Sequence, residues 1–198
     1  MFAFILFLLF YFDNDELNYE IDNTINSKID YLDVDINKTS HNAVIYEDGV
    51  ETYYVGGDGH EIYLQNNPNA TNPTYDELII FLKNDKTDLI QYTDNFVCAD
   101  FAERVHNNAE ESGIRAAWVS LDFDNDNEGH ALNAFHTVDN GLVFTDSTGS
   151  VESTPCGYDR KIGIEIGKHI WTYKLYDCAE DYYYLLPSSK VKEVKIFW

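Results

Sequence analysis

The sequence predicts an α+β domain whose sheet is antiparallel. Apolar residues recur at helical spacing over residues 74–84 and 96–112, and strand-like alternation begins after Gly113. The tripeptide Asp139-Asn140-Gly141 then separates two alternating segments, which is the pattern of a hairpin. With 198 residues, of which 44% are hydrophobic, the chain is long enough to bury the core of one such domain.

The chain is strongly acidic, with 13 Lys and Arg residues against 35 Asp and Glu residues and a net charge of -22. A nucleic-acid backbone would be repelled by this field, and no basic stripe interrupts it. Binding of DNA or RNA is therefore excluded. We expect the acidic surface to serve solubility rather than the recognition of a particular ligand.

The amino terminus, residues 1–12, is apolar without interruption and reads MFAFILFLLFYF. As a helix it would rise about 18 Å, short of the roughly 30 Å hydrocarbon core of a bilayer. It matches the apolar part of a secretory signal or of a membrane anchor, with a buried strand or helix of the domain as the alternative. Residues 13–43 are polar and rich in Asp and Asn, and we expect them to form a stalk. The protein is thus predicted to be extracellular or membrane-anchored and facing outside.

The domain itself is predicted over residues 44–198, with its core over residues 74–149. Its first part carries two short strand patterns, at 53–55 and 62–64, on either side of a glycine-rich turn. A polar stretch with the composition of a loop follows these strands and leads into the core.

The first helix begins at Thr74. Thr74 and Glu77 have the spacing of a capping box, in which each side chain accepts a hydrogen bond from the backbone of the other residue. Apolar residues at helical spacing follow, and the helix is predicted to end near Asn84.

The second helix is predicted over residues 96–112. Asp94 or Asn95 would supply its N-cap, and Gly113 follows its last turn, where glycine commonly ends a helix. Its apolar stripe consists of Val97, Phe101, Ala102, Val105 and Ala109.

Alternation of apolar and polar residues predicts the strands of the sheet. In the first of them, Ala117, Val119, Leu121 and Phe123 line one face. The predicted strands span residues 117–123, 130–138, 142–146, 162–166, 171–175, 182–186 and 191–198.

The chain has three cysteines, an odd number, so one disulfide would leave one free thiol. By position the natural pair is Cys156 with Cys178, which leaves Cys98 free. The sequence has no CxxC motif and no Cys/His spacing of a zinc site, so we expect no structural zinc.

Cys98 falls in the first turn of the second predicted helix, where the helix dipole and unpaired N–H groups favour a thiolate. The alternative is an inert cysteine packed behind the helix. His130 opens one strand of the predicted hairpin and Asp146 closes the other. Pairing across the turn places residue 134 roughly opposite Asp146. The side chains of His130 and Asp146 are therefore predicted to lie within a few residues of each other along the hairpin.

With these three residues in this order, the stretch 92–149 resembles the catalytic core of the transglutaminase-like superfamily. Val97-Cys98-Ala99 resembles the segment of its nucleophile, Gly129-His130-Ala131 that of its base, and Asp146-Ser147-Thr148 that of its third member. The resemblance implies a papain-like fold, in which a helix carrying the cysteine packs on an antiparallel sheet carrying the histidine and the aspartate.

The resemblance also implies acyl transfer on the amide bonds of a peptide or protein through a thioester, with hydrolysis favoured over cross-linking. The Cys98 amide would hold the oxyanion, with Gln91 or Asn95 as the second donor. This chemistry needs no cofactor and no metal. A non-catalytic extracellular or wall-associated binding module that keeps the fold is the alternative function.

Two other patterns resemble sites without fitting them. Residues 122–128 are acidic like a calcium loop, but Asn127 and Asn133 stand where an EF-hand needs glycine and glutamate. His136, with Asp139 as its acid, ranks below His130 as the base, and a metal site shared by these histidines fits no common ligand spacing. His106 is expected on a solvated helix face.

Overall fold

The computed structural model describes residues 43–46, 52–125, 129–149, 159–176 and 189–198. Within these ranges the helices are α2 (Tyr75–Asn84), the 3-10 helix η2 (Thr87–Leu89) and α3 (Cys98–Glu111). The strands are β1 (Ala43–Tyr46), β2 (Ala117–Phe123), β3 (Gly129–Thr137), β4 (Gly141–Asp146), β5 (Arg160–Gly163), β6 (Trp171–Lys174) and β7 (Val191–Phe197). The predicted strand at 182–186 lies outside the described residues.

The strands form one sheet in the order β1-β7-β2-β3-β4-β5-β6. Every neighbouring pair is antiparallel except β1 and β7, which run parallel. The α+β class is thus confirmed, but the expectation of a wholly antiparallel sheet is wrong at this edge. β1 was not predicted because its four residues, AVIY, are too few to show an alternating pattern.

Side-chain hydrogen bonds cap the first turn of both α-helices. The Thr74 hydroxyl accepts from the amide of Glu77 at 3.2 Å, and the Glu77 carboxylate accepts from the amide of Thr74 at 2.7 Å, so the predicted capping box is present. The second helix starts at Cys98 rather than at residue 96, and Val97, not Asp94 or Asn95, is its N-cap. The acceptor for the cap amide comes from inside the helix, because the Asp100 carboxylate accepts from Val97 N at 2.8 Å.

β2 lies in the middle of the sheet and is buried on both faces except at Asp122. Trp118 points toward α3 and donates from its indole to the carbonyl of Ala99 at 3.2 Å. Asn133 of β3 does the same, donating to the carbonyl of Ala102 at 2.8 Å. The alternation seen in the sequence therefore separates two buried faces rather than a buried face from a solvated one.

The turn between β3 and β4 lies one residue earlier in the chain than predicted. Thr137 pairs with Gly141, so three residues lie between the strands, and Gly141 adopts a φ of 65°. A three-residue hairpin turn commonly ends with a residue in this left-handed conformation, which glycine adopts without strain. The pairing of Asn133 with Thr145 puts Asp146 opposite Leu132, two residues closer to His130 than expected.

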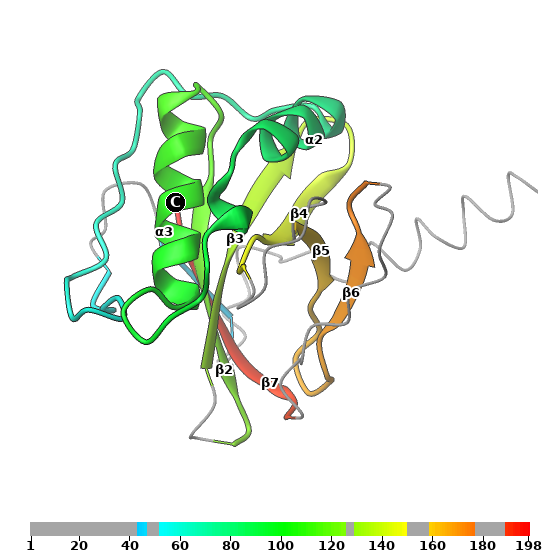
Figure 1. The fold of residues 1–198 in the computed structure, drawn as a ribbon. Coiled ribbons are helices and arrows are strands. Elements are labelled where there is room, and N and C mark those ends of the chain that lie inside the picture. The colour runs from blue at the N-terminus through cyan, green and yellow to red at the C-terminus, as the bar shows by residue number, and fades with distance from the viewer. Residues whose placement is uncertain (1–42, 47–51, 126–128, 150–158, 177–188) are drawn as a thin grey trace, which may run out of the picture. The chain divides into compact units, whose positions relative to one another are not determined.

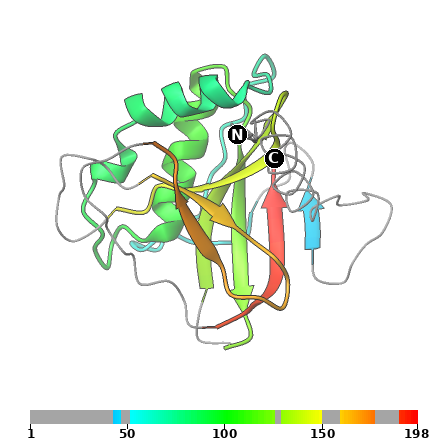
Figure 2. The ribbon, with the colours of Figure 1, turned by 90° about the vertical axis from the view of Figure 1, so that its right-hand side faces the viewer.

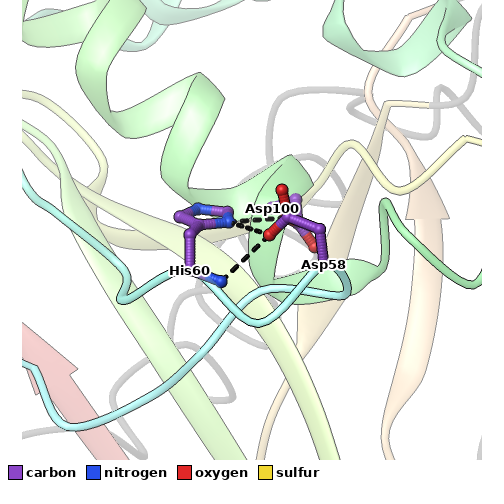
Figure 3. A group of neighbouring side chains, drawn as sticks. All are labelled: Asp58, His60 and Asp100. Atoms are coloured by element: carbon purple, nitrogen blue, oxygen red, sulfur yellow. Dashed lines mark hydrogen bonds and ion pairs between the residues drawn. The ribbon is translucent and has the colours of Figure 1, made fainter.

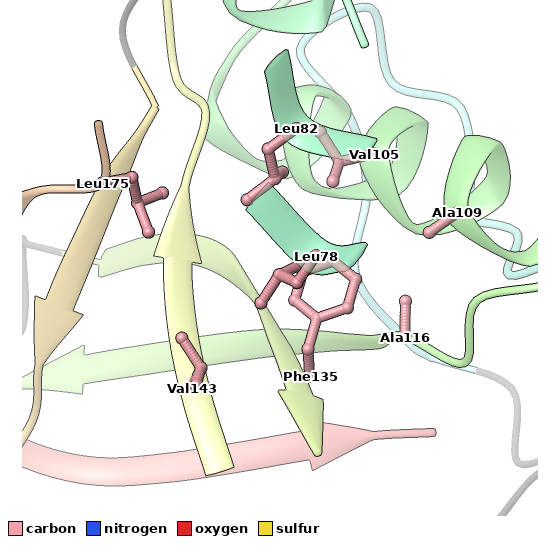
Figure 4. Close-up of a cluster of buried hydrophobic side chains, with 8 residues drawn as sticks. All are labelled: Leu78, Leu82, Val105, Ala109, Ala116, Phe135, Val143 and Leu175. Carbon is pink, nitrogen blue, oxygen red and sulfur yellow. The ribbon is translucent and has the colours of Figure 1, made fainter. Parts of the chain in front are cut away.

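The core on the helix side joins α2 and α3 to β3 and β4 (Figures 1 and 4). Phe135 of β3 is fully buried at its centre, and the rings of Phe81 and Phe135 lie 6.3 Å apart. The buried members are Leu78, Leu82, Val105, Ala109, Ala116, Phe135, Val143 and Leu175. This cluster fixes both helices against the hairpin, and Figure 2 shows them on the same side of the sheet.

Three local predictions need correction. The segments at 53–55 and 62–64 form no regular strands, because only the bridge between Val55 and Glu61 joins them. β5 begins at Arg160 and ends at Gly163, earlier than predicted. His106 is fully buried rather than solvated, with its Nδ1 3.0 Å from the side-chain oxygen of Asn107.

Candidate active site

Cys98 is the first residue of α3, so its thiol lies at the positive end of the helix dipole. The side chain is free and partly exposed. The side chain of His130 and the amide of Ala131 lie close enough to the thiol to lower its pKa. The start of α3 is thereby held against the start of β3, which is the packing that a Cys–His pair requires.

His130 and Asp146 come from the two strands of the hairpin, β3 and β4. His130 Nε2 donates to Asp146 Oδ2 at 3.0 Å, and both side chains are buried. Because Nε2 is engaged by the carboxylate, Nδ1 is the nitrogen left to exchange a proton with the thiol. The order thiol, imidazole and carboxylate is that of a nucleophile, a base and the group that orients the base.

Asp146 is fixed by more than its histidine. Its second oxygen, Oδ1, accepts from the amide of Thr148 at 2.8 Å. Arg160 of β5, which pairs with Asp146 across the sheet, places its Nη1 3.8 Å from Oδ2. Sequence reasoning missed Arg160, because only the pairing of β4 with β5 brings it to the site.

The charges of the three groups support one another. Burial of Cys98 opposes its thiolate, but His130 and the Ala131 amide outweigh this effect and lower the pKa of the thiol. Burial of His130 likewise opposes its imidazolium, but Asp146 and Cys98 outweigh this effect and raise its pKa. The Asp146 carboxyl, buried beside His130 and Arg160, has a pKa below its usual range. These shifts favour a thiolate–imidazolium pair at neutral pH.

The second oxyanion donor, predicted to be Gln91 or Asn95, stays a prediction. Gln91 and Asn95 are exposed, and among the described residues no hydrogen bond joins either side chain to Cys98 or His130. Tyr92 lies beside the start of α3, where its hydroxyl interacts with the backbone amide of Cys98. Burial, then the charge of Cys98, raises the pKa of Tyr92, which keeps its hydroxyl protonated.

The other sequence candidates lie away from this centre. His136 is exposed on β3, and the described part of the acidic loop, residues 122–125, uses Asp122 to pair with Lys195 at 2.8 Å. The predicted pair Cys156 and Cys178 and the apolar residues 1–12 lie outside the described residues. Among the helices that the structure describes, none combines the length and apolar character needed to cross a bilayer.

A partly buried acid, Asp159, lies beside this site. It accepts from the hydroxyl of Ser147 at 2.7 Å and from that of Tyr176 at 2.5 Å. Burial, then the negative charge of Asp88, raises the pKa of Asp159 to about 7. Asp159 therefore takes up a proton in the folded protein at a pH where an unfolded chain would have lost it.

The substitution Asp159→Asn is expected to stabilise the protein at pH 8 by about 2 kcal/mol and to leave it unchanged near pH 4. Because the folded-state pKa is raised, wild-type stability falls as the pH rises from about 4 to about 7, whereas asparagine has no charge to bury. The full difference in pKa corresponds to about 4 kcal/mol, and reorientation of the two hydroxyls would offset about half. Urea unfolding of both proteins across this range measures the effect, and parallel pH profiles would contradict it.

The structure thus brings together Cys98, His130 and Asp146 from three separate elements of the chain. Arg160 lies next to Asp146 and Tyr92 lies next to Cys98. The chain matches no known family model, and it is not significantly similar to a curated protein or to a solved structure.

Proposed function

We propose that this protein is a thiol-dependent acyl-transfer enzyme that acts on the amide bonds of peptides or proteins. The observation that carries the proposal is the line of three side chains in which His130 lowers the pKa of the Cys98 thiol and binds Asp146 at 3.0 Å. Such a line activates a thiol, orients its base and stabilises the charge that forms on the base. The fold proposed for this arrangement is papain-like, of the transglutaminase-like kind.

In the proposed reaction the Cys98 thiolate attacks the carbonyl carbon of the amide. The Cys98 amide would exchange the Tyr92 hydroxyl for the oxyanion, and the Tyr92 hydroxyl would turn its own proton toward the same oxygen as the second donor. His130 then gives its Nδ1 proton to the leaving amine as the C–N bond breaks, and a thioester remains on Cys98. Water, deprotonated by His130, releases the acid, whereas a second amine would give a cross-linked product.

Asp146 and Arg160 are positioning residues in this scheme. The Asp146 carboxylate fixes the ring of His130 by binding Nε2, and it is itself held by Thr148 and Arg160. Hydrolysis is the favoured outcome of the reaction. We further propose that the protein faces the outside of the cell and that residues 1–12 tether it to the membrane.

The proposal predicts a thioester on Cys98 during incubation with a peptide pool rich in side-chain amides. Mass spectrometry would show the chain heavier by the acyl group, and hydroxylamine would remove that group. Because the thiol forms the bond, Cys98→Ala should lower turnover by at least about a thousandfold. The matched control is His136→Ala, an exposed histidine of the same strand, which should leave turnover unchanged. Absence of any adduct or product while Cys98 still reacts rapidly with iodoacetamide would contradict the enzyme and favour a binding module.

A further inference from the structure

A cluster of three side chains lies beside the first turn of α3, at a place that the proposed reaction does not use (Figure 3). It consists of Asp58, His60 and Asp100. Asp58 and His60 lie in the loop that follows Val55, and Asp100 lies in the first turn of α3. Asp100 follows Cys98 by two residues, or about 200° around the helix, so its side chain leaves the helix on the side away from the thiol.

The ligand atoms of these three side chains lie close enough together to reach one ion, and two of them are hydrogen-bonded to each other. His60 Nδ1 lies 2.5 Å from Asp58 Oδ1 and 3.7 Å from Asp100 Oδ1. All three atoms lie within 4.8 Å of one another. Ligands about 2.0–2.2 Å from a tetrahedral ion are about 3.4 Å apart, which is close to the separation from Asp100. Asp58 would give up its hydrogen bond to the imidazole and move back by about 1 Å to share the ion.

Surrounding groups already orient two of these ligands. The other ring nitrogen of His60, Nε2, lies 2.8 Å from Glu103 Oε2, which is the carboxylate–histidine arrangement found behind metal-bound imidazoles. Asp100 is only 3% exposed, and its Oδ2 accepts from the amides of Gly57 at 2.9 Å and Val97 at 2.8 Å. Its Oδ1 takes part in neither bond and points at His60 Nδ1.

The backbone of the loop is shaped to allow this approach. A Cβ atom on Gly56 would lie 2.3 Å from Asp100 Oδ1 and 2.4 Å from the His60 ring. A Cβ on Gly57 would lie 2.7 Å from the carbonyl oxygen of Asp94. Glycine at position 56 thus leaves the space in which the imidazole and the carboxylate meet, and glycine at position 57 lets the loop lie against the backbone that enters α3.

We propose that Asp58, His60 and Asp100 bind a divalent cation of the zinc class, with Glu103 orienting the imidazole from behind. A cavity of about 360 Å³, lined by all four side chains, leaves room for a water molecule as the fourth ligand. Three carboxylates around one imidazole favour a cation, and the nitrogen ligand favours zinc or a similar ion over calcium, which prefers oxygen ligands.

The ion would fasten the loop to the first turn of α3, the turn that begins with Cys98. It would not contact the thiol, because its ligands lie on the opposite side of the helix. The site is therefore proposed as structural, in contrast to the sequence-based expectation of no structural zinc, because its ligands follow none of the Cys/His spacings of zinc motifs. The proposal stands whether or not the protein is an enzyme.

Titration of the full chain with Zn²⁺ by calorimetry tests the site. We expect one ion per chain in the wild type and in Cys98→Ala. His60→Ala and Asp58→Asn should each weaken binding at least tenfold. Both of these side chains are more than a third exposed, so the substitutions should not unfold the protein. His169→Ala, an exposed histidine far along the chain, is the control and should bind like the wild type.

The absorption spectrum of the protein loaded with Co²⁺ in place of Zn²⁺ identifies the type of ligand. We expect no strong thiolate-to-cobalt band, because the proposed ligands are nitrogen and oxygen atoms and not a cysteine sulfur. Equal affinity in the wild type and His60→Ala, or no stoichiometric binding, would overturn the proposal. So would loss of binding in Cys98→Ala, which would place the ion on the thiol, or displacement of Zn²⁺ by an equal concentration of Ca²⁺.

Discussion

Replacing His130 by alanine is expected to slow the alkylation of Cys98 about thirtyfold at pH 6. In the wild type the imidazolium lowers the pKa of the thiol, so the reactive thiolate persists in mild acid. Without His130, burial and the charge of Asp146 remain, and both raise the pKa of the thiol. An ordinary thiol is only about 0.3% ionised at pH 6, and the greater nucleophilicity of a more basic thiolate offsets part of this deficit.

The measurement is the rate of iodoacetamide labelling against pH, with Cys156 and Cys178 replaced by serine in every protein. His136→Ala provides the control, because it removes an exposed imidazole from the same strand without touching the thiol. Identical profiles for wild type and His130→Ala, each rising only above about pH 8.5, would mean that Cys98 is an ordinary thiol. The enzyme proposal would then be abandoned in favour of a binding module.

Replacing Phe135 by alanine is expected to cost about 3–5 kcal/mol of the free energy of unfolding. Its ring is fully buried where α2 meets the sheet, and it packs against Leu78 and Phe81 (Figure 4). Removing the ring loses the free energy of burying its apolar surface. It also leaves a cavity, because the two helices and two strands around the ring can move only partly into the space. Urea unfolding followed by circular dichroism measures the loss.

Ile80→Ala is the matched control for this substitution. Ile80 lies in α2, the helix that packs on Phe135, but its side chain is 60% exposed. Its truncation should change the free energy of unfolding by less than about 0.5 kcal/mol. A loss below about 1 kcal/mol for Phe135→Ala, with an unchanged dependence on urea, would show that the two helices do not rely on this contact.

Predictions from the sequence were best where neighbouring residues decide the structure. The capping box at Thr74 and the stop at Gly113 depend on hydrogen bonds and backbone angles within one turn of the helix. The alternation of β2 likewise requires no distant partner. The start of α3 was placed two residues too early, because its cap acceptor is Asp100 inside the helix rather than a residue before it.

The approach of His130 to Asp146 was predictable because one hairpin carries both residues, although the register differed by two positions. That Cys98 meets this pair was expected from a family resemblance, and the packing of α3 on β3 places it there. Arg160 and Tyr92 were not predicted to join the site. Arg160 depends on the pairing of β4 with β5, and Tyr92 on how the chain enters α3.

The sequence by itself determined the helices, most of the strands and the identity of the three residues proposed for catalysis, because these depend on local periodicity, capping and turns. Tertiary structure alone decided the contacts between segments far apart in the chain. It joined Asp58 and His60 to Asp100 across about forty residues of sequence, a separation that no local motif records. It also buried both faces of β2, because burial is set by what packs on a strand and not by the strand's own residues.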